Sequence, residues 1–83
     1  MAGLPMSRGN AHLTQRPTTT APSAQHLLAQ GATIAGKTQT SEYGVATYCE
    51  PIGFPAVDNP LWPGRTPGGS SGGAAALVAG GHV

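Results

Sequence analysis

The sequence predicts a piece of an α/β protein that is too short to form a whole sheet. Three observations support this fold class. A helical pattern covers about 20–30, a short apolar segment at about 32–38 is typical of a buried strand, and a glycine–serine turn leads into a small-residue helix at about 70–81. A single strand has no sheet of its own, so we expect this strand to belong to a larger sheet.

The first helix is expected over about 20–30. Thr20 can cap its start, and the residues that follow are good helix formers. Leu27 and Leu28 belong to a narrow apolar stripe at helical spacing, which offers one face for burial. Gly31 supplies a left-handed C-terminal cap and ends the helix.

The remaining segments are expected to be irregular. Residues 1–19 contain turn formers without apolar periodicity, and residues 39–69 form a long loop because prolines break the segment repeatedly. A loop of that length is usually functional or disordered. Within it, we expect Trp62 and Phe54 to pack the loop down and Cys49 to be a small apolar filler. The prolines are Pro51, Pro55, Pro60, Pro63 and Pro67.

The composition argues against independent folding. The 83 residues include 13 Gly and 8 Pro, and only 8% of them are charged, where roughly a quarter is usual in a soluble domain. A chain of this size also buries only a modest share of its surface. We therefore expect the chain to fold poorly alone.

The same composition excludes several partners and sites. The net charge is +1 and the four basic residues are scattered, so no basic stripe for nucleic acid exists. Cys49 cannot form an internal disulfide, and His12, His26 and His82 are too far apart for a local metal motif. The N-terminus lacks a secretory signal, and the apolar run at 72–81 is far shorter than the roughly 20 residues that span a bilayer. We expect a cytoplasmic chain with no metal, cofactor, membrane or direct nucleic-acid partner.

The stretch from Thr66 to Gly81, "TPGGSSGGAAALVAGG", carries the most specific pattern. Glycine turns before helices present N–H groups to anions, but a phosphate loop needs a lysine where Ser70 stands. The dinucleotide-binding fingerprint also fails, because no strand leads directly into the turn. Taken alone, the glycine–serine pattern favours a linker or a helix start. A third interpretation depends on motifs elsewhere in the chain.

These motifs together resemble the amidase signature family of serine amide hydrolases. Pro67–Gly73, with its paired glycines and serines, corresponds to the core motif of that family. Gly36–Gln39 and Asn59–Pro60 match two upstream motifs, with Gln39 where the family usually has Asn. The N-terminal "AGLPMSRGNAHL", the helix end "LLAQGA" and Ser41–Gly44 match as well, so the resemblance covers essentially the whole chain. The resemblance implies that the chain is a fragment of a fold in which helices flank a central mixed sheet. It also implies that the intact protein hydrolyses linear carbon–nitrogen amide bonds.

The resemblance implies a catalytic role for Ser70. The family uses a lysine, a serine in a cis peptide and a serine nucleophile, and the lysine takes the proton through the middle serine. Ser70 matches this relay, with the Gly69–Ser70 bond as the cis one, and Gly44 matches a position whose backbone lines the acyl pocket. Ser71 is expected to orient Ser70 by hydrogen bonding. The supporting residues are Gly68, Gly69, Ser71, Gly72 and Gly73.

Lys37 is the only lysine of the chain, and a Ser–Lys pair is a known catalytic arrangement. The resemblance instead places Lys37 in the second, Gly-Lys-Thr-Asn motif, so we expect a structural or surface role. The catalytic lysine of the family belongs to an earlier motif, and its nucleophile follows later than Val83. Because catalytic groups act as a unit, we expect these 83 residues alone to be inactive.

Two alternatives remain open. The chain could be a non-catalytic remnant or interaction module that packs on a second, complementary amidase chain. It could also be a piece of a glutamyl-tRNA amidotransferase A-type subunit. In the intact family, the partner is a small-molecule amide substrate, and these residues do not distinguish one amide from another.

Overall fold

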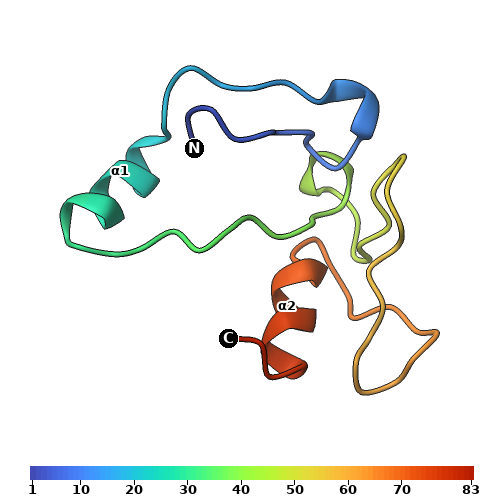
Figure 1. Cartoon of the computed structure of the whole chain (residues 1–83). Coiled ribbons are helices and arrows are strands. Elements are labelled where there is room, and N and C mark those ends of the chain that lie inside the picture. The colour runs from blue at the N-terminus through green and yellow to red at the C-terminus, as the bar shows by residue number, and fades with distance from the viewer.

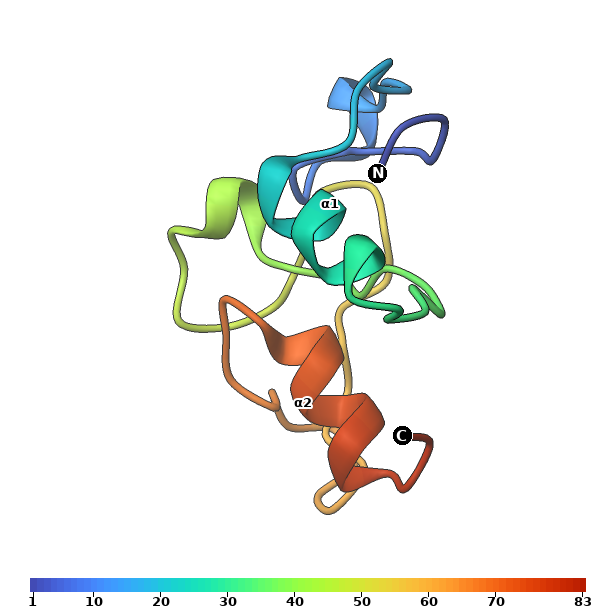
Figure 2. The same cartoon turned by 90° about the vertical axis from the view of Figure 1, so that its left-hand side faces the viewer.

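A computed structural model describes residues 1–83, and most of the chain is irregular (Figure 1). The regular elements are two helices, α1 (Pro22–Ala29) and α2 (Gly72–Ala79), and two single 3-10 turns at Ala11–Leu13 and Glu42–Gly44. The two helices do not contact each other, and irregular segments connect them (Figure 2).

Helix α1 begins after the predicted position because Thr20 does not cap it. Ala21 occupies the cap position without a side-chain hydrogen bond, and Pro22 fills the first turn, where its missing N–H leaves no bond unmade. The hydroxyl of Thr20 instead accepts a 3.0 Å hydrogen bond from the backbone N–H of Ala2, which ties the N-terminus to the start of the helix. Gly31 has a φ of +88° just beyond the helix, as a left-handed C-terminal cap requires.

The strand expected at about 32–38 is not formed in this chain. No backbone N–H of residues 33–40 donates a hydrogen bond. The only β pairing consists of two isolated bridges, Met6 with Gln15 and Asn10 with Ile52. A strand needs a neighbour that bonds its backbone, and here the chain supplies none. The predicted α/β class is therefore represented by two helices and almost no strand.

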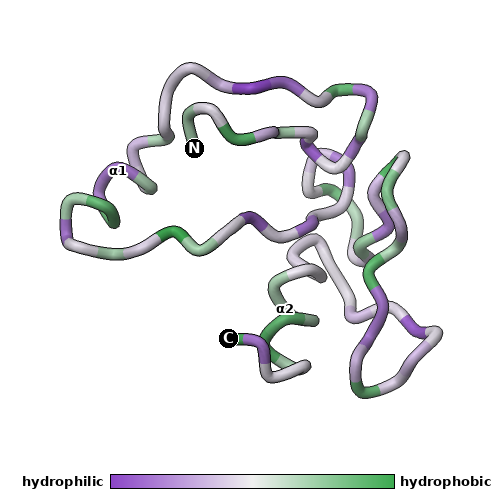
Figure 3. The backbone as a smooth tube through the Cα atoms, viewed as in Figure 1, coloured by the Kyte–Doolittle hydropathy of each residue, from purple (hydrophilic) through white to green (hydrophobic).

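The molecule is open and has a very small core. Its radius of gyration is 13.6 Å, whereas a compact domain of this length has about 12 Å. Its accessible surface is 5674 Å², against about 4,600 Å² for a folded monomer of this mass. Apolar residues are spread along the chain instead of gathered at a centre (Figure 3). Six of the 83 residues are buried: Gly9, Ser41, Cys49, Pro51, Gly72 and Gly73.

Asn59 closes a turn within the long loop. Its side-chain oxygen accepts hydrogen bonds from the backbone N–H groups of Leu61 at 2.9 Å and Trp62 at 3.3 Å. Its own N–H donates to the carbonyl of Arg65 at 2.9 Å. An asparagine that bonds the backbone two residues on is a common turn former. The turn leaves Trp62 66% exposed, so the prediction that Trp62 packs the loop down is wrong.

Helix α2 docks on the rest of the chain through its first turn. The N–H of Gly73 donates a 3.1 Å hydrogen bond to the carbonyl of Gln39. A Cβ on Gly73 would lie 2.5 Å from the nitrogen and 2.7 Å from the oxygen of Gln39. A side chain therefore does not fit here, and the close approach of the two backbones requires glycine. The far end of α2 is exposed, including Val78.

Replacing Gly73 with alanine should undock α2. The Gly73→Ala variant is expected to lower the free energy of unfolding by about 1–3 kcal/mol, because the new methyl group overlaps backbone that cannot move aside. The measurement is urea unfolding followed by circular dichroism. Gly36→Ala is the matched control, since nothing lies within 4 Å of a Cβ at Gly36, and it should change stability by less than about 0.5 kcal/mol. Equal effects of the two substitutions would contradict this account of the docking.

Candidate active site

The turn Pro67–Gly73 lies directly on the backbone of the long loop. A Cβ on Gly69 would be 2.7 Å from the carbonyl carbon of Tyr48, so backbone contacts backbone here. Gly72 faces the side chain of Cys49, which is fully buried. Together with the docking of the first turn of α2, these contacts hold one side of the segment Pro67–Gly73 against the loop.

Ser70 is held at this turn by its own backbone. The Gly69–Ser70 peptide bond is cis, as the resemblance implies. The carbonyl of Ser70 accepts a 3.1 Å hydrogen bond from the N–H of Ser41. The side chain is half-buried, and its Oγ lies 3.9 Å from the position that a Cβ on Gly44 would take. The structure thus brings Ser70 and Gly44 together.

Gly44 faces Ser70 with its backbone because the chain turns sharply before it. Gly44 has a φ of +70°, in the left-handed region that favours glycine. The preceding Tyr43 also has a positive φ, +50°, which is uncommon for a residue with a side chain. The N–H of Gly44 closes the turn by donating to the carbonyl of Ser41 at 3.0 Å.

Ser41 connects the parts of the site, and the sequence did not single it out. Its side chain is only 2% exposed, and its hydroxyl accepts a 3.2 Å hydrogen bond from the N–H of Ala46. Its backbone bonds both Ser70 and Gly44. The available signal was its place at the start of the matching Ser41–Gly44 motif, but that motif gives no reason to expect a buried serine.

The N-terminal segment contacts the turn Ser41–Gly44 from another side. The carbonyl of Arg8 accepts a 2.8 Å hydrogen bond from the N–H of Tyr43. The amide of Asn10 donates to the carboxylate of Glu42 at 3.0 Å. Gly9 is buried between them, where a Cβ would lie 2.5 Å from the backbone nitrogen of Glu42. The sequence alone assigns no role to Asn10 or Glu42, because their positions differ by 32 residues and only the fold brings them together.

Ser71 and Gly68 lie at the edges of the turn. Ser71 is exposed at the start of α2, and its side chain makes no capping hydrogen bond. No hydrogen bond joins it to Ser70 either, so the expected orienting bond is absent. The N–H of Gly68 donates to the hydroxyl of Thr66 at 3.1 Å. Nothing lies within 4 Å of a Cβ at Gly68, so Gly68 shapes the turn without contacting the rest of the site.

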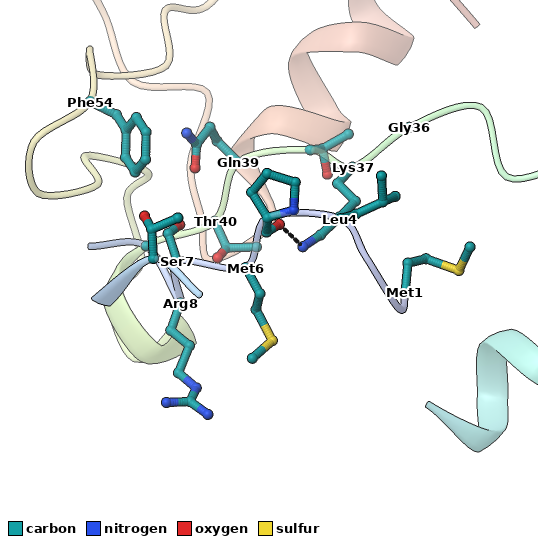
Figure 4. Close-up of a pocket in the computed structure, with 14 residues that line it drawn as sticks. Met1, Leu4, Met6, Ser7, Arg8, Gly36, Lys37, Gln39, Thr40 and Phe54 are labelled. Atoms are coloured by element: carbon teal, nitrogen blue, oxygen red, sulfur yellow. Dashed lines mark hydrogen bonds between the residues drawn. The ribbon is translucent and has the colours of Figure 1, made fainter. Parts of the chain in front are cut away.

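Lys37 is engaged elsewhere. Its exposed Nζ donates a 2.6 Å hydrogen bond to the carbonyl of Pro5 (Figure 4). This contact fits the structural role expected from the sequence. No group of three or more His, Cys, Asp or Glu side chains is placed to hold a metal ion. Neither helix has the length and apolar character needed to cross a membrane.

The arrangement suits a group that passes a proton. A serine hydroxyl can donate one hydrogen bond and accept others at the same time. Ser70 is half-buried, and its hydroxyl lies beside Gly44.

Comparison with known proteins identifies the family. A model of the family described as Amidase matches residues 1–83, the whole chain. The chain belongs to the amidase family. No solved structure matches this amidase chain.

Relatives of two kinds match the amidase chain. It is 52% identical over 59 residues to the A-type subunit of glutamyl-tRNA(Gln) amidotransferase from Haloarcula marismortui, a match that covers 71% of the chain and 14% of the relative. The same subunit from Halobacterium salinarum is 44% identical over 82 residues, with 98% of the chain and 19% of the relative covered. The putative amidase AmiB2 of Mycobacterium tuberculosis is 42% identical over 81 residues, covering 98% and 18%. The chain therefore spans less than a fifth of the length of these relatives.

The hydroxyl of Ser41 should contribute to the stability of the amidase chain. Ser41→Ala removes the acceptor for the N–H of Ala46, and we expect a loss of about 1–3 kcal/mol in the free energy of unfolding, because the N–H then lacks a partner. Ser71→Ala is the matched control, since the side chain of Ser71 is exposed and makes no capping bond. It should change stability by less than about 0.5 kcal/mol. Urea unfolding followed by circular dichroism compares the two, and a larger loss for Ser71→Ala would refute this assignment.

Proposed function

We propose that this chain is a segment of a hydrolase of linear carbon–nitrogen amide bonds, and that Ser70 is its proton relay. One observation carries the proposal. The hydroxyl of Ser70 lies beside the backbone of Gly44, and the resemblance assigns these two positions to the relay and to the acyl pocket. The family membership of the whole chain supports the reaction class.

In the proposed mechanism, Ser70 accepts a proton from a nucleophilic serine and hands its own proton to a lysine. The proton returns by the same route to the leaving amine. Residues 1–83 supply the relay, the turn that holds it and the backbone of Gly44. The lysine and the nucleophile of the resemblance belong to motifs that match no residue among these 83, and Lys37, the single lysine, bonds the carbonyl of Pro5.

A second candidate is a piece of a glutamyl-tRNA amidotransferase A-type subunit. The identity of 52% over 59 residues to a relative of that name favours it. Such a relative is one component of an assembly, so this candidate predicts that the segment works inside a complex. The two candidates share the relay serine and differ in the amide that is cleaved.

A chimera tests the role of Ser70. Residues 1–83 replace the matching segment of the putative amidase of Mycobacterium tuberculosis, and hydrolysis of a panel of simple amides and of glutamine is measured. We expect Ser70→Ala to lower kcat/KM by about 100-fold or more, the usual effect of losing a proton-transfer group. Ser23→Ala, an exposed serine on α1, should leave it within about threefold.

Thermal melting of each chimera against the parent enzyme separates loss of function from misfolding. A folded Ser70→Ala chimera that hydrolyses amides like its parent would refute the relay role. Preference for glutamine over the simple amides would favour the amidotransferase candidate.

The 83-residue chain alone should hydrolyse no amide. A relay without its base and nucleophile gives almost no rate enhancement, because such groups act as a unit. The test incubates the purified chain with the same amides and with a fluorophosphonate that labels active serine hydrolases. Labelling at background level, equal in the chain and in its Ser70→Ala variant, is the expected result. Strong labelling that disappears in the variant would contradict it.

A further inference from the structure

Two residues with side chains have left-handed backbone conformations, and they are bonded to each other. Arg8 has a φ of +53° and Tyr43 a φ of +50°, and every other residue with a positive φ is a glycine. The N–H of Tyr43 donates a 2.8 Å hydrogen bond to the carbonyl of Arg8. Such conformations are unfavourable for residues with a side chain, and they persist only where the surrounding structure holds them, often at functional sites. Other contacts must therefore offset the cost of this junction.

Asn10 supplies a side-chain contact at the junction. Its amide nitrogen donates a 3.0 Å hydrogen bond to Oε1 of Glu42, and its amide oxygen accepts a 3.0 Å hydrogen bond from the N–H of His12. These two partners fix the orientation of the amide, because a carboxylate only accepts and a backbone N–H only donates. Asn10 and Glu42 are both half-buried. Their bond is the only hydrogen bond between two side chains in the molecule.

The backbone around Asn10 is anchored independently of Glu42. Asn10 forms the isolated parallel bridge with Ile52. In this bridge the N–H of Ile52 donates to the carbonyl of Gly9 at 2.8 Å, and the N–H of Ala11 donates to the carbonyl of Ile52 at 2.8 Å. The amide of Asn10 therefore reaches Glu42 from a fixed position, so the bond can hold Glu42 in place.

Glu42 lies in the turn whose two ends contact Ser70. At one end, the N–H of Ser41 donates a 3.1 Å hydrogen bond to the carbonyl of Ser70. At the other end, Gly44 lies beside the hydroxyl of Ser70. The turn is closed by the bond from the N–H of Gly44 to the carbonyl of Ser41. Because one end of the turn is bonded to Ser70, a rotation of the turn would change the position of Gly44 relative to the hydroxyl.

We propose that Asn10 and Glu42 are positioning residues for the proton relay. Their hydrogen bond holds the turn Ser41–Gly44 against the N-terminal segment and so keeps Gly44 beside the hydroxyl of Ser70. This inference rests on the proposed function, because it requires Ser70 as the relay and Gly44 in the acyl pocket. A displacement of about 1 Å at a reacting group can lower a rate about 100-fold. A group that acts on the geometry of the reaction lowers kcat, whereas one that acts on substrate binding raises KM.

Exchanging the two side-chain groups tests the bond in the chimera with the putative amidase of Mycobacterium tuberculosis. Asn10→Asp keeps the acceptor for the N–H of His12 but places a second carboxylate against Glu42. It should lower kcat at least about tenfold and leave KM within about threefold, because the like charges push the turn away. Adding Glu42→Gln restores a hydrogen bond, now donated from position 42 to position 10, and should return kcat to within about threefold of the chimera.

Glu50→Gln is the matched control for this rescue. Glu50 is exposed, and combining Glu50→Gln with Asn10→Asp gives the same net charge as the rescued variant, but it should restore nothing. Glu42→Met keeps the proposal testable if Asn10→Asp does not fold, because it removes the acceptor without adding a charge. It should also lower kcat at least about tenfold, and thermal melting shows whether each chimera is folded.

Hydrogen exchange measured by NMR in the 83-residue chain tests the geometry without any activity. The N–H groups of Tyr43 and Gly44 should exchange at least about tenfold faster in Asn10→Asp than in the parent chain, and at the parent rate once Glu42→Gln is added. The N–H of Asn59, which bonds the carbonyl of Arg65, should keep its rate. Faster exchange at Asn59 as well would indicate general unfolding and count against a positioning role.

The proposal is overturned if Asn10→Asp and Glu42→Met both leave kcat unchanged, or if Glu50→Gln rescues as well as Glu42→Gln. It is also overturned if the N–H groups of Tyr43 and Gly44 exchange freely in the parent chain. Failure of the proposed function gives a different result, since Ser70→Ala then leaves the chimera active while the exchange rates still respond to Asn10→Asp.

Discussion

Contact of backbone directly on backbone is the constraint on which this structure depends. Gly9, Gly69 and Gly73 each lie against another part of the main chain at a distance that leaves no room for a methyl group. These contacts replace the core of large side chains that most domains have. They determine geometry strictly but bury little apolar surface, so the hydrophobic contribution to stability is small. A well-defined site therefore exists in a molecule with only six buried residues.

Local sequence signals predicted the helices of the chain. The residue at which the first helix begins depended on a hydrogen bond between distant residues. The helix at about 20–30 followed from residue types and from Gly31, yet its start lies at Pro22 because Thr20 bonds the N-terminus instead of capping. The strand at about 32–38 needed information that residue patterns do not contain, since apolar composition favours a strand only where a neighbour exists. Trp62 illustrates the same limit, because whether an aromatic residue is buried depends on what lies over it.

The candidate site was predictable where the resemblance assigns a role to a residue, and unpredictable where segments meet through hydrogen bonds alone. The resemblance pointed to Ser70 and to Gly44, which lie side by side. It did not predict that Ser41 joins them, or that Asn10 and Glu42 brace them. Those residues act through hydrogen bonds between segments, which leave no local pattern. Ser71 was expected to orient its neighbour, but it is exposed at the start of α2 and its side chain bonds neither the helix nor Ser70.

The buried thiol of Cys49 gives the molecule a reporter of its own. Cys49 is the single cysteine of the chain, has no exposed surface and is covered by Gly72 at the start of α2. A buried thiol reacts with an alkylating reagent only when the structure around it opens. The alkylation rate of the chain therefore measures how often the structure around Cys49 opens, including its contact with Gly72.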